Sequence, residues 1–456
     1  MDMTSKNRLG QENIGRLLFS LSLPAIIGQL VNLLYNIVDR IYIGHIEGIG
    51  GQALTGVGLA MPIVIIITAF AALVGMGGAP RMAIMMGRED LDSARKILGN
   101  ASSLLVIISI LLTAFFLALN EKLLLLFGAS PETLGYALDY MGIYTLGTIF
   151  VQLAIGLNPF ISSQGFSKTS MFTVLIGALL NIVLDPIFIF VLDMGVRGAA
   201  LATVISQAFS AFWVLAFLRS DRGLVRLDRK YMGLDGQVLL PIIGLGLSPF
   251  IMQVTESLTS IAFNINLQKY SGDAAIAAMT ILTSAMQFLF LPLSGLTQGA
   301  QPILSYNFGA GRLDRVRDTF KLLLKSALIY TAIFWGFLMV WPGVFASIFT
   351  SDREIIDLAS WGMRIFMASG IFMAVQISCQ QTFVALGNAK TSLFLAILRK
   401  IILLIPLIFI LPLLTKNKVL GVLLAEPLAD FLAASTSSYL FYREFKSFFK
   451  KKEGQA

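Results

Sequence analysis

Two aspartates lie within stretches of sequence that are otherwise apolar enough to cross a lipid bilayer. Asp39 follows a run of Leu, Ile and Val that begins near residue 17, and Asp185 lies four residues after Asn181 in the segment NIVLDPIFIF. Placing a charged side chain at the bilayer centre costs roughly 2.5 to 3.5 kcal/mol on insertion scales, so such residues usually pair with one another or line a pathway. Two carboxylates in a partly dehydrated pocket also repel each other, so one of them should hold a proton near neutral pH. These residue types predict a coupling site, where a proton, or Na⁺ held by carboxylate, amide and hydroxyl oxygens, compensates the charge.

Asp39 also has a plainer interpretation. Residues 17–38 already suffice to cross the membrane, so Asp39 and Arg40 would simply mark its boundary. Other polar residues argue against this boundary interpretation. They recur at helical spacings of three and four, and so share helix faces. Those on the fourth and sixth apolar segments also lie at the membrane depth of the two aspartates. These polar residues are Asn32, Tyr35 and Asn36 on the first segment, Tyr136, Tyr140 and Tyr144 on the fourth, and Thr203 and Gln207 on the sixth. The alternative is that this cluster only joins the helices through buried hydrogen bonds.

The composition indicates which class of protein positions these residues. Of 456 residues, 56% are hydrophobic and 13% are charged, and the mean hydropathy is +0.81. Soluble domains carry roughly 25% charged residues, so this chain is predicted to be an all-α polytopic membrane protein. The net charge of +8 lies in short loops between apolar segments and does not indicate a nucleic-acid partner. The single Cys379 excludes an internal disulfide, and the single His45 leaves no histidine cluster for a metal site.

Apolar runs bounded by Gly, Pro or charged residues predict twelve transmembrane helices. They are placed near residues 17–43, 53–79, 97–119, 133–157, 170–192, 199–218, 240–268, 274–303, 322–347, 358–384, 393–414 and 420–442. The first is too long for a signal-peptide core and no small-residue cleavage site follows it, so we expect it to be retained. Basic residues concentrate in alternate loops, for example between Arg219 and Lys230. This asymmetry predicts a multi-pass cell-membrane protein with both termini in the cytoplasm.

An internal repeat relates the two halves of the chain at a constant offset of 222 residues. Six spans per unit is an even number, so the halves form parallel repeats related by an axis along the membrane normal. In transporters built from repeats, the substrate site lies near the repeat interface and one half rocks against the other. The clearest correspondences are Gly77, Pro80 and Gly87 with Gly299, Pro302 and Gly309. We expect a first six-helix lobe over 1–218, a cytoplasmic linker over 219–239, a second lobe over 240–442 and a basic cytoplasmic tail over 443–456.

The second half carries different polar residues. The position equivalent to Asp185 is Leu407, so the cation site is not duplicated. Glu256 is the stronger acidic candidate of this half, with the alternative that it merely pairs with Gln or Arg partners. Glu426 and Asp430, four residues apart on the twelfth segment, rank after it. One face of the seventh segment carries Gln253, Glu256, Ser260 and Asn264.

Several segments together carry a family resemblance. They are NIVDRIYIG at 36–44, the paired GxxP elements at Gly77 to Pro80 and Gly299 to Pro302, QGAQPILSYNFGAG at 298–311, and NIVLDPIFIF at 181–190. Through them, nearly the whole chain resembles the multidrug and toxic compound extrusion (MATE) transporters, in their DinF/MepA-like bacterial branch. The resemblance implies twelve helices in two six-helix lobes that form a V, and export of organic cations driven by inward H⁺ or Na⁺.

The resemblance also implies roles for single residues. Asp39, Asn181 and Asp185, joined by Tyr140 and Thr203, look like the cation site of the N-terminal lobe, and Na⁺ would be held by the first three. Glu256 resembles the acidic residue of the NorM branch, although the tenth segment lacks the acidic partner found in that branch. With the polar stripes above, the predicted substrate pathway is lined by Asn32, Tyr35, Asn36, Tyr136, Gln207, Gln253 and Glu256.

We therefore expect a secondary antiporter that exports amphipathic, cationic small molecules in exchange for H⁺ or Na⁺ by alternating access, as a monomer without a cofactor in the lipid bilayer. The rival hypothesis is a flippase for an anionic lipid-linked precursor, which Arg364, Arg399 and Lys400 would favour. Arg399 and Lys400 are instead expected to snorkel to the cytoplasmic surface. An intramembrane enzyme such as a prenyltransferase would need acidic pairs in a loop like DDxxD, and the sequence contains none, so no enzymatic activity is expected.

Overall fold

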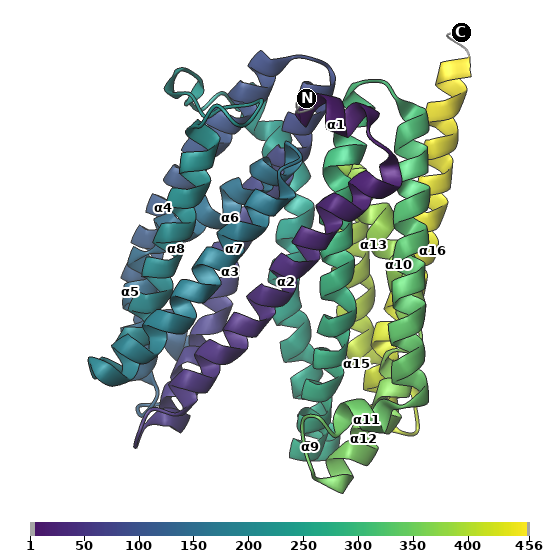
Figure 1. Cartoon of the computed structure of the whole chain (residues 1–456). Helices are drawn as coiled ribbons and strands as arrows, with labels where there is room; N and C mark the ends of the chain where they lie inside the picture. The colour runs from purple at the N-terminus through teal and green to yellow at the C-terminus, as the bar shows by residue number, and fades with distance from the viewer. Residues whose placement is uncertain (1–4, 454–456) are drawn as a thin grey trace.

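The computed structural model describes residues 5–453, and in that range the chain consists of helices and short connections without a strand. Figure 1 shows these helices running side by side in two bundles. In chain order the elements are α1 (Ser5–Gln11), α2 (Ile14–Gly44), α3 (Gly50–Gly87), α4 (Leu91–Leu126), α5 (Leu134–Leu146), α6 (Thr148–Ser163), α7 (Ser167–Pro186), η1 (Ile187–Val191), α8 (Gly195–Arg219), η2 (Arg229–Tyr231), α9 (Gly236–Gly309), α10 (Leu313–Val340), α11 (Pro342–Ala346), α12 (Arg353–Phe366), α13 (Gly370–Ala385), α14 (Ala389–Ile397), η3 (Leu398–Leu404), α15 (Ile405–Leu414) and α16 (Lys418–Glu453).

The predicted transmembrane helices are confirmed, and two of them are bent. Within the described residues, ten helices are long and apolar enough to cross a membrane, and two bent pairs bring the number to as many as twelve. The angle between α5 and α6 is 59°, and that between α12 and α13 is 50°. The long α9 contains two of the spans, because Gly272 adopts a left-handed φ of 68° and interrupts the helix.

Local sequence determines where several helices begin or change their winding. Asn13 accepts hydrogen bonds from two backbone N–H groups at the start of α2, and Asp90 accepts one from Ser93 at 3.0 Å at the start of α4. Such side chains supply the partners that the first turn of a helix lacks. In α7, Pro186 has no backbone N–H to donate, and after Pro186 the helix continues as the π-helical segment η1.

Three clusters of buried apolar side chains define the architecture. One contains only residues between Ile43 and Ala200, and a second contains only residues between Ala262 and Ala429. The third combines residues of both halves, among them Leu17 of α2, Phe160 of α6 and Phe383 of α13. The bundles therefore have separate cores at one end and a shared core at the other, which confirms the V shape. Figure 1 shows them spreading apart away from the end that carries both termini.

Glycines bring the two repeats into backbone contact where the bundles meet. A Cβ atom on Gly87, at the end of α3, would lie 2.0 Å from the carbonyl oxygen of Tyr306 on α9. A Cβ atom on Gly309, at the end of α9, would lie 2.0 Å from the carbonyl oxygen of Ile84. The 222-residue offset relates the two contacts to each other, so the junction has the twofold symmetry expected of parallel repeats.

The α2 helix connects the junction to the interior of the N-terminal bundle. Its first half packs on α9, where Ser22 donates Oγ to the carbonyl of Leu296 at 3.1 Å and Gln29 donates Nε2 to Oε1 of Gln298 at 3.3 Å. Its second half packs on α7 and carries Asp39. Figure 1 shows α2 crossing diagonally from one bundle to the other. The same helix therefore carries Asp39 and forms part of the contact between the bundles.

Candidate functional site

The N-terminal bundle holds a buried polar cluster on three neighbouring helices. Asp39 lies on α2, Asn181 and Asp185 lie on α7, and Thr203 lies on α8, while α7 packs against both other helices. Asp39 is 8% exposed and Asp185 is fully buried. Asn181 donates Nδ2 to Oδ1 of Asp185 at 3.0 Å and to Oγ1 of Thr203 at 3.4 Å. The fold thus brings together residues that the sequence places at one depth of the membrane.

Three buried oxygen atoms of this cluster lack a hydrogen-bond donor. The side chains of Asp39 and Asp185 interact directly with each other. Oδ1 of Asp39, Oδ1 of Asn181 and Oδ2 of Asp185 accept no hydrogen bond from any described residue. Buried acceptors without donors are costly, and two adjacent carboxylates repel each other when both are ionised. A bound proton would reduce both costs, and the same oxygen atoms are the kind of ligand that a hard cation such as Na⁺ takes.

Tyrosine side chains surround the cluster. Tyr140 on α5 lies beside Thr203 and within electrostatic reach of Asp39, and Tyr35 on α2 is close to both aspartates. The rings of Tyr140 and Tyr144 stack with their centroids 5.9 Å apart. Tyr144 is a member of this wall that the predicted site residues did not include, although its spacing of four from Tyr140 indicated a shared face.

The residues predicted to line the substrate pathway divide between the two bundles. An exposed polar stripe on a membrane-spanning helix is expected to face water or protein rather than lipid. Each bundle presents one such stripe, on the repeat-related helices α2 and α9. Asn32, Asn36, Gln253 and Glu256 are exposed on these stripes, whereas Tyr35, Tyr136 and Gln207 are half-buried. Neither Tyr136 nor Gln207 has a hydrogen bond to the N-terminal cluster within the described part of the chain.

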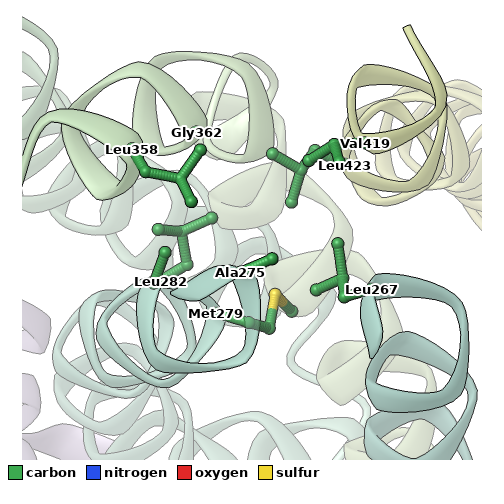
Figure 2. A pocket seen from close by; sticks show the side chains of 9 residues that line it. Leu267, Ala275, Met279, Leu282, Leu358, Gly362, Val419 and Leu423 are labelled. Carbon is green, nitrogen blue, oxygen red and sulfur yellow. The ribbon is translucent and has the colours of Figure 1, made fainter. Parts of the chain in front are cut away.

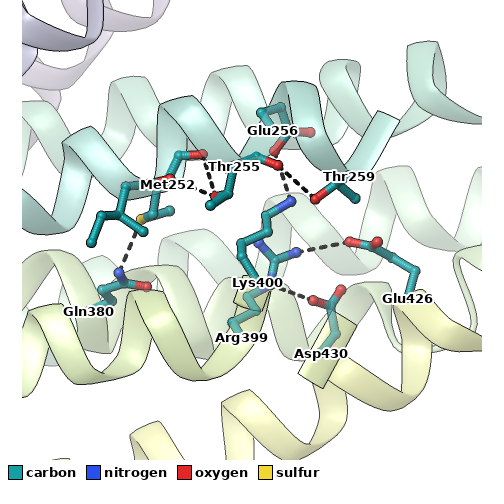
Figure 3. Close-up of polar contacts among 10 residues, drawn as sticks. Met252, Thr255, Glu256, Thr259, Gln380, Arg399, Lys400, Glu426 and Asp430 are labelled. Atoms are coloured by element: carbon teal, nitrogen blue, oxygen red, sulfur yellow. Dashed lines mark hydrogen bonds and ion pairs between the residues drawn. The ribbon is translucent and has the colours of Figure 1, made fainter. Parts of the chain in front are cut away.

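The C-terminal bundle holds a network of five charged side chains on α9, η3 and α16 (Figure 3). Arg399 donates Nε to Oδ1 of Asp430 at 2.7 Å and Nη2 to Oε1 of Glu426 at 3.1 Å. Lys400 donates Nζ to Oε2 of Glu256 at 2.8 Å. The three acidic residues singled out in the second half of the sequence are therefore all ion-paired with basic residues of the same bundle.

The prediction that Arg399 and Lys400 snorkel to the cytoplasmic surface is wrong. Both side chains are buried inside the bundle, with exposures of 9% and 6%. A basic side chain reaches for the membrane surface when the interior offers no counter-ion, but here α9 and α16 offer three carboxylates within ion-pair distance. The π-helical segment η3 carries both basic residues, and such segments are frequent at functional sites.

A small pocket elsewhere in the C-terminal bundle is lined by apolar residues (Figure 2). Its walls include Leu267, Ala275, Met279 and Leu282 of α9, Leu358 and Gly362 of α12, and Val419 and Leu423 of α16. Binding sites for small molecules usually add a few convergent polar groups that orient the ligand, and this pocket has none. Among the described residues, no group of three or more His, Cys, Asp or Glu side chains could hold a metal ion.

Comparisons with known proteins point to one family. The MatE family model matches residues 24–187 and 249–410, which includes most of both repeats. The chain is 27% identical to the multidrug export protein MepA of Staphylococcus haemolyticus (strain JCSC1435), over 93% of each chain. It is also 27% identical to MepA of Staphylococcus aureus (strain NCTC 8325), over 92% of each chain.

Solved structures share the fold. The TM-score is 0.92 with a MATE transporter in its bent conformation, at 22% identity and with 99% of each chain covered. It is 0.91 with an outward-facing multidrug resistance MATE transporter of the MOP superfamily, at 22% identity and with 99% of this chain and 100% of that one covered.

Proposed function

Because the chain belongs to the MatE family, we propose that it is a secondary antiporter that exports amphipathic, cationic compounds in exchange for H⁺ or Na⁺. It is a multi-pass membrane protein, as its apolar helices and its relatives indicate. The MepA relatives are multidrug export proteins, which supports small molecules as the cargo. We further propose that it acts as a monomer and needs no cofactor.

The topology follows from the repeat and from the positions of the basic residues. We assign one lobe to residues 1–218 and the other to 240–442, with 219–239 as the linker and 443–456 as a basic tail. Of these, residues 1–4 and 454–456 lie outside the described residues. Basic loops favour the cytoplasmic side, so both termini and the shared core are placed there. On this assignment the bundles spread apart toward the outside.

One observation carries the proposed coupling: three oxygen atoms, on Asp39, Asn181 and Asp185, are buried without a donor from the described residues. They make a compact set of acceptors in which a proton or Na⁺ is the missing partner. Tyr140 and Thr203 stand next to this set and complete the proposed cation site. The hydroxyl of Thr203 already accepts from Asn181 and so holds the amide oxygen in a fixed orientation.

Charge neutralisation links the ion to the cargo. When the coupling ion neutralises Asp39 and Asp185, their repulsion ends and α2 packs more closely on α7. Since the first half of α2 packs on α9, this shift reaches the junction between the lobes. We propose that substrate affinity then falls, the cargo leaves outside, and the lobes rock so that the ion leaves inside. By linkage, substrate binding must lower the affinity for the ion to the same extent.

Two of the three basic residues that would favour a flippase, Arg399 and Lys400, are already neutralised within the protein. Arg399 and Lys400 pair with three carboxylates, which leaves no spare positive charge for a lipid diphosphate. Arg364 donates Nε to the carbonyl of Met339 at 3.3 Å at the surface of the C-terminal bundle. We therefore favour the antiporter.

Ethidium transport in energised inverted membrane vesicles tests this function. Wild-type protein should accumulate ethidium when a pH gradient alone, or a sodium gradient alone, is imposed, and the effective gradient identifies the ion. Asp39→Asn and Asp185→Asn should abolish accumulation. Asp139→Asn is the matched control, because Asp139 pairs with Arg197 at the surface of the same lobe. Robust accumulation by both buried-site variants would reject the proposed coupling site.

A further inference from the structure

The charge network of the C-terminal bundle has one more negative than positive group. Its members are Glu256, Arg399, Lys400, Glu426 and Asp430, so three carboxylates lie against two cations when all are ionised. An uncompensated charge in a low-dielectric interior is costly, and pairing with a further cation relieves that cost. The network is therefore suited to one additional monovalent cation.

Glu256 is the accessible member of the network. Its side chain is 65% exposed, whereas that of Lys400 is 6% exposed and those of the other three are at most 9% exposed. Glu256 also belongs to the exposed polar stripe of α9, between Gln253 and Ser260. A cation that approaches this stripe meets the Glu256 carboxylate, which the Lys400 ammonium already contacts at 2.8 Å (Figure 3).

Lys400 also interacts electrostatically with a second carboxylate of the network. Its ammonium group interacts electrostatically with Glu426 as well as with Glu256. Figure 3 shows Lys400 between Glu256 on α9 and Glu426 on α16. If another cation takes Glu256, Lys400 keeps a buried counter-ion, so the exchange leaves no charge unpaired. The flexible four-carbon stem of lysine allows its ammonium group to turn from one carboxylate toward the other.

The repeat places this network on the counterparts of the helices that carry the N-terminal cluster. At the 222-residue offset, Glu256 corresponds to Leu34 on α2, and Lys400 corresponds to Ala178 on α7. These are the helices of Asp39 and Asp185. The N-terminal bundle thus leaves buried oxygens for a cation from solution, whereas the C-terminal bundle supplies a cation that is part of the chain.

We propose that Lys400 is a tethered cation that competes with cationic substrates for Glu256. This proposal rests on the proposed export function. It narrows the substrate class to monovalent organic cations, because one positive charge balances the network. Without substrate, Lys400 pairs with Glu256. A substrate cation binds Glu256 while Lys400 turns to Glu426, and the return of Lys400 to Glu256 promotes release of the substrate.

Equilibrium binding of ethidium to the purified full-length protein in lipid nanodiscs tests this competition. Lys400→Gln removes the competitor but keeps Glu256, so ethidium should bind on the order of three- to tenfold more tightly than to the wild type. Lys400→Arg retains a cation and should keep the wild-type affinity. Lys122→Gln, at an exposed lysine of α4 in the other bundle, is the matched control and should change nothing.

Two variants of Glu256 complete the test. Glu256→Gln should weaken ethidium binding, and adding Lys400→Gln to it should give no gain, because the contested carboxylate is gone. Glu256→Asp keeps both charges but draws the carboxylate away from Lys400, and it should tighten ethidium binding as Lys400→Gln does. The exposure of Glu256 leaves its carboxylate hydrated when Lys400 is absent, so thermal unfolding should show all variants folded.

Three results would overturn the proposed competition, and each has a different consequence for the proposed export function. Equal ethidium affinity in wild type and Lys400→Gln removes the competition and leaves the export function standing. Weaker ethidium binding by Lys400→Gln, with loss of binding of an anionic dye, makes the lysine a ligand for anions instead. Failure of ethidium to bind any variant removes both the competition and organic cations as the cargo.

Discussion

Asn181 donates a 3.0 Å hydrogen bond from Nδ2 to Oδ1 of Asp185, while Oδ2 of the same carboxyl group accepts none from the described residues. Half of the Asp185 carboxyl group is therefore satisfied by its own helix, and the other half depends on something bound beside Asp39. The effect of Asp185 on the stability of the fold can therefore be measured separately from its effect on transport.

Asp185→Asn should stabilise the protein while it abolishes gradient-driven export. The new amide can donate to Oδ1 of Asp39 and ends the repulsion between the two acids, which is worth about 1–2 kcal/mol. Thermal unfolding in detergent should therefore give a higher Tm than for the wild type, with Asp139→Asn unchanged. A Tm below that of the control would mean that Asp185 serves mainly to hold the bundle together.

Arg399→Met should be strongly destabilising. It would remove the cation that pairs with Glu426 and Asp430, both buried, at a cost of about 3–5 kcal/mol in the free energy of unfolding. Adding Glu426→Gln and Asp430→Asn should restore much of the loss. Denaturant unfolding in detergent measures both effects, with the surface variant Arg197→Met as the control. If Arg399→Met proves as stable as that control, the network does not stabilise the bundle.

Gly309→Ala should weaken the junction between the lobes. Its Cβ atom would lie 2.0 Å from the carbonyl oxygen of Ile84, so the backbones of α3 and α9 must separate, at about 1–3 kcal/mol. Gly87→Ala should behave alike, since the repeat relates the two contacts. Gly336→Ala in α10 has no atom within 4 Å of the new Cβ and should be neutral or slightly stabilising. Equal melting temperatures for all three variants would contradict the close contact.

Arg315→Ala should loosen the start of the chain. Arg315 donates Nη2 to the carbonyl of Glu12 at 2.8 Å, which ties the end of α1 to α10. Without this bond, amide hydrogen exchange near residues 9–17 should quicken on the order of tenfold, equivalent to about 1.4 kcal/mol. Lys321→Ala, an exposed position on α10, serves as the control. Unchanged exchange in the Arg315 variant would show that other contacts hold α1.

The fold was largely predictable because each membrane span is a continuous run of apolar residues in the sequence. The predicted span at 170–192, for example, is found at Ser167–Val191. The bend between α5 and α6 was not predicted, and it lies at Gly147, where the chain packs closely on a distant segment. At Gly147 a Cβ atom would lie 2.4 Å from the side chain of Val204 on α8. No local pattern in the sequence reports that contact.

The two charged sites differ in how much of their geometry could be predicted from the sequence. Asp39 and Asp185 could be predicted to lie close together from their positions along their spans. Both positions fall at the same membrane depth, on helices of one repeat. The position of Arg399 along its span did not predict the direction of its side chain. That direction depends on the acidic residues opposite it on α16. Which helix faces lie opposite each other is a tertiary fact, and a basic residue near a membrane boundary goes where its counter-ions are.

The most direct test of the account is the linkage between the coupling ion and the substrate at equilibrium. The Kd for ethidium, which stays cationic throughout, should be measured in nanodiscs from mildly alkaline to mildly acidic pH, with and without Na⁺. For wild-type protein, we expect protons or Na⁺ to weaken ethidium binding on the order of tenfold or more, because they discharge Asp39 and Asp185. In Asp39→Asn and Asp185→Asn this dependence should disappear. A wild-type Kd that responds to neither ion, or a response that both variants retain in full, would contradict it.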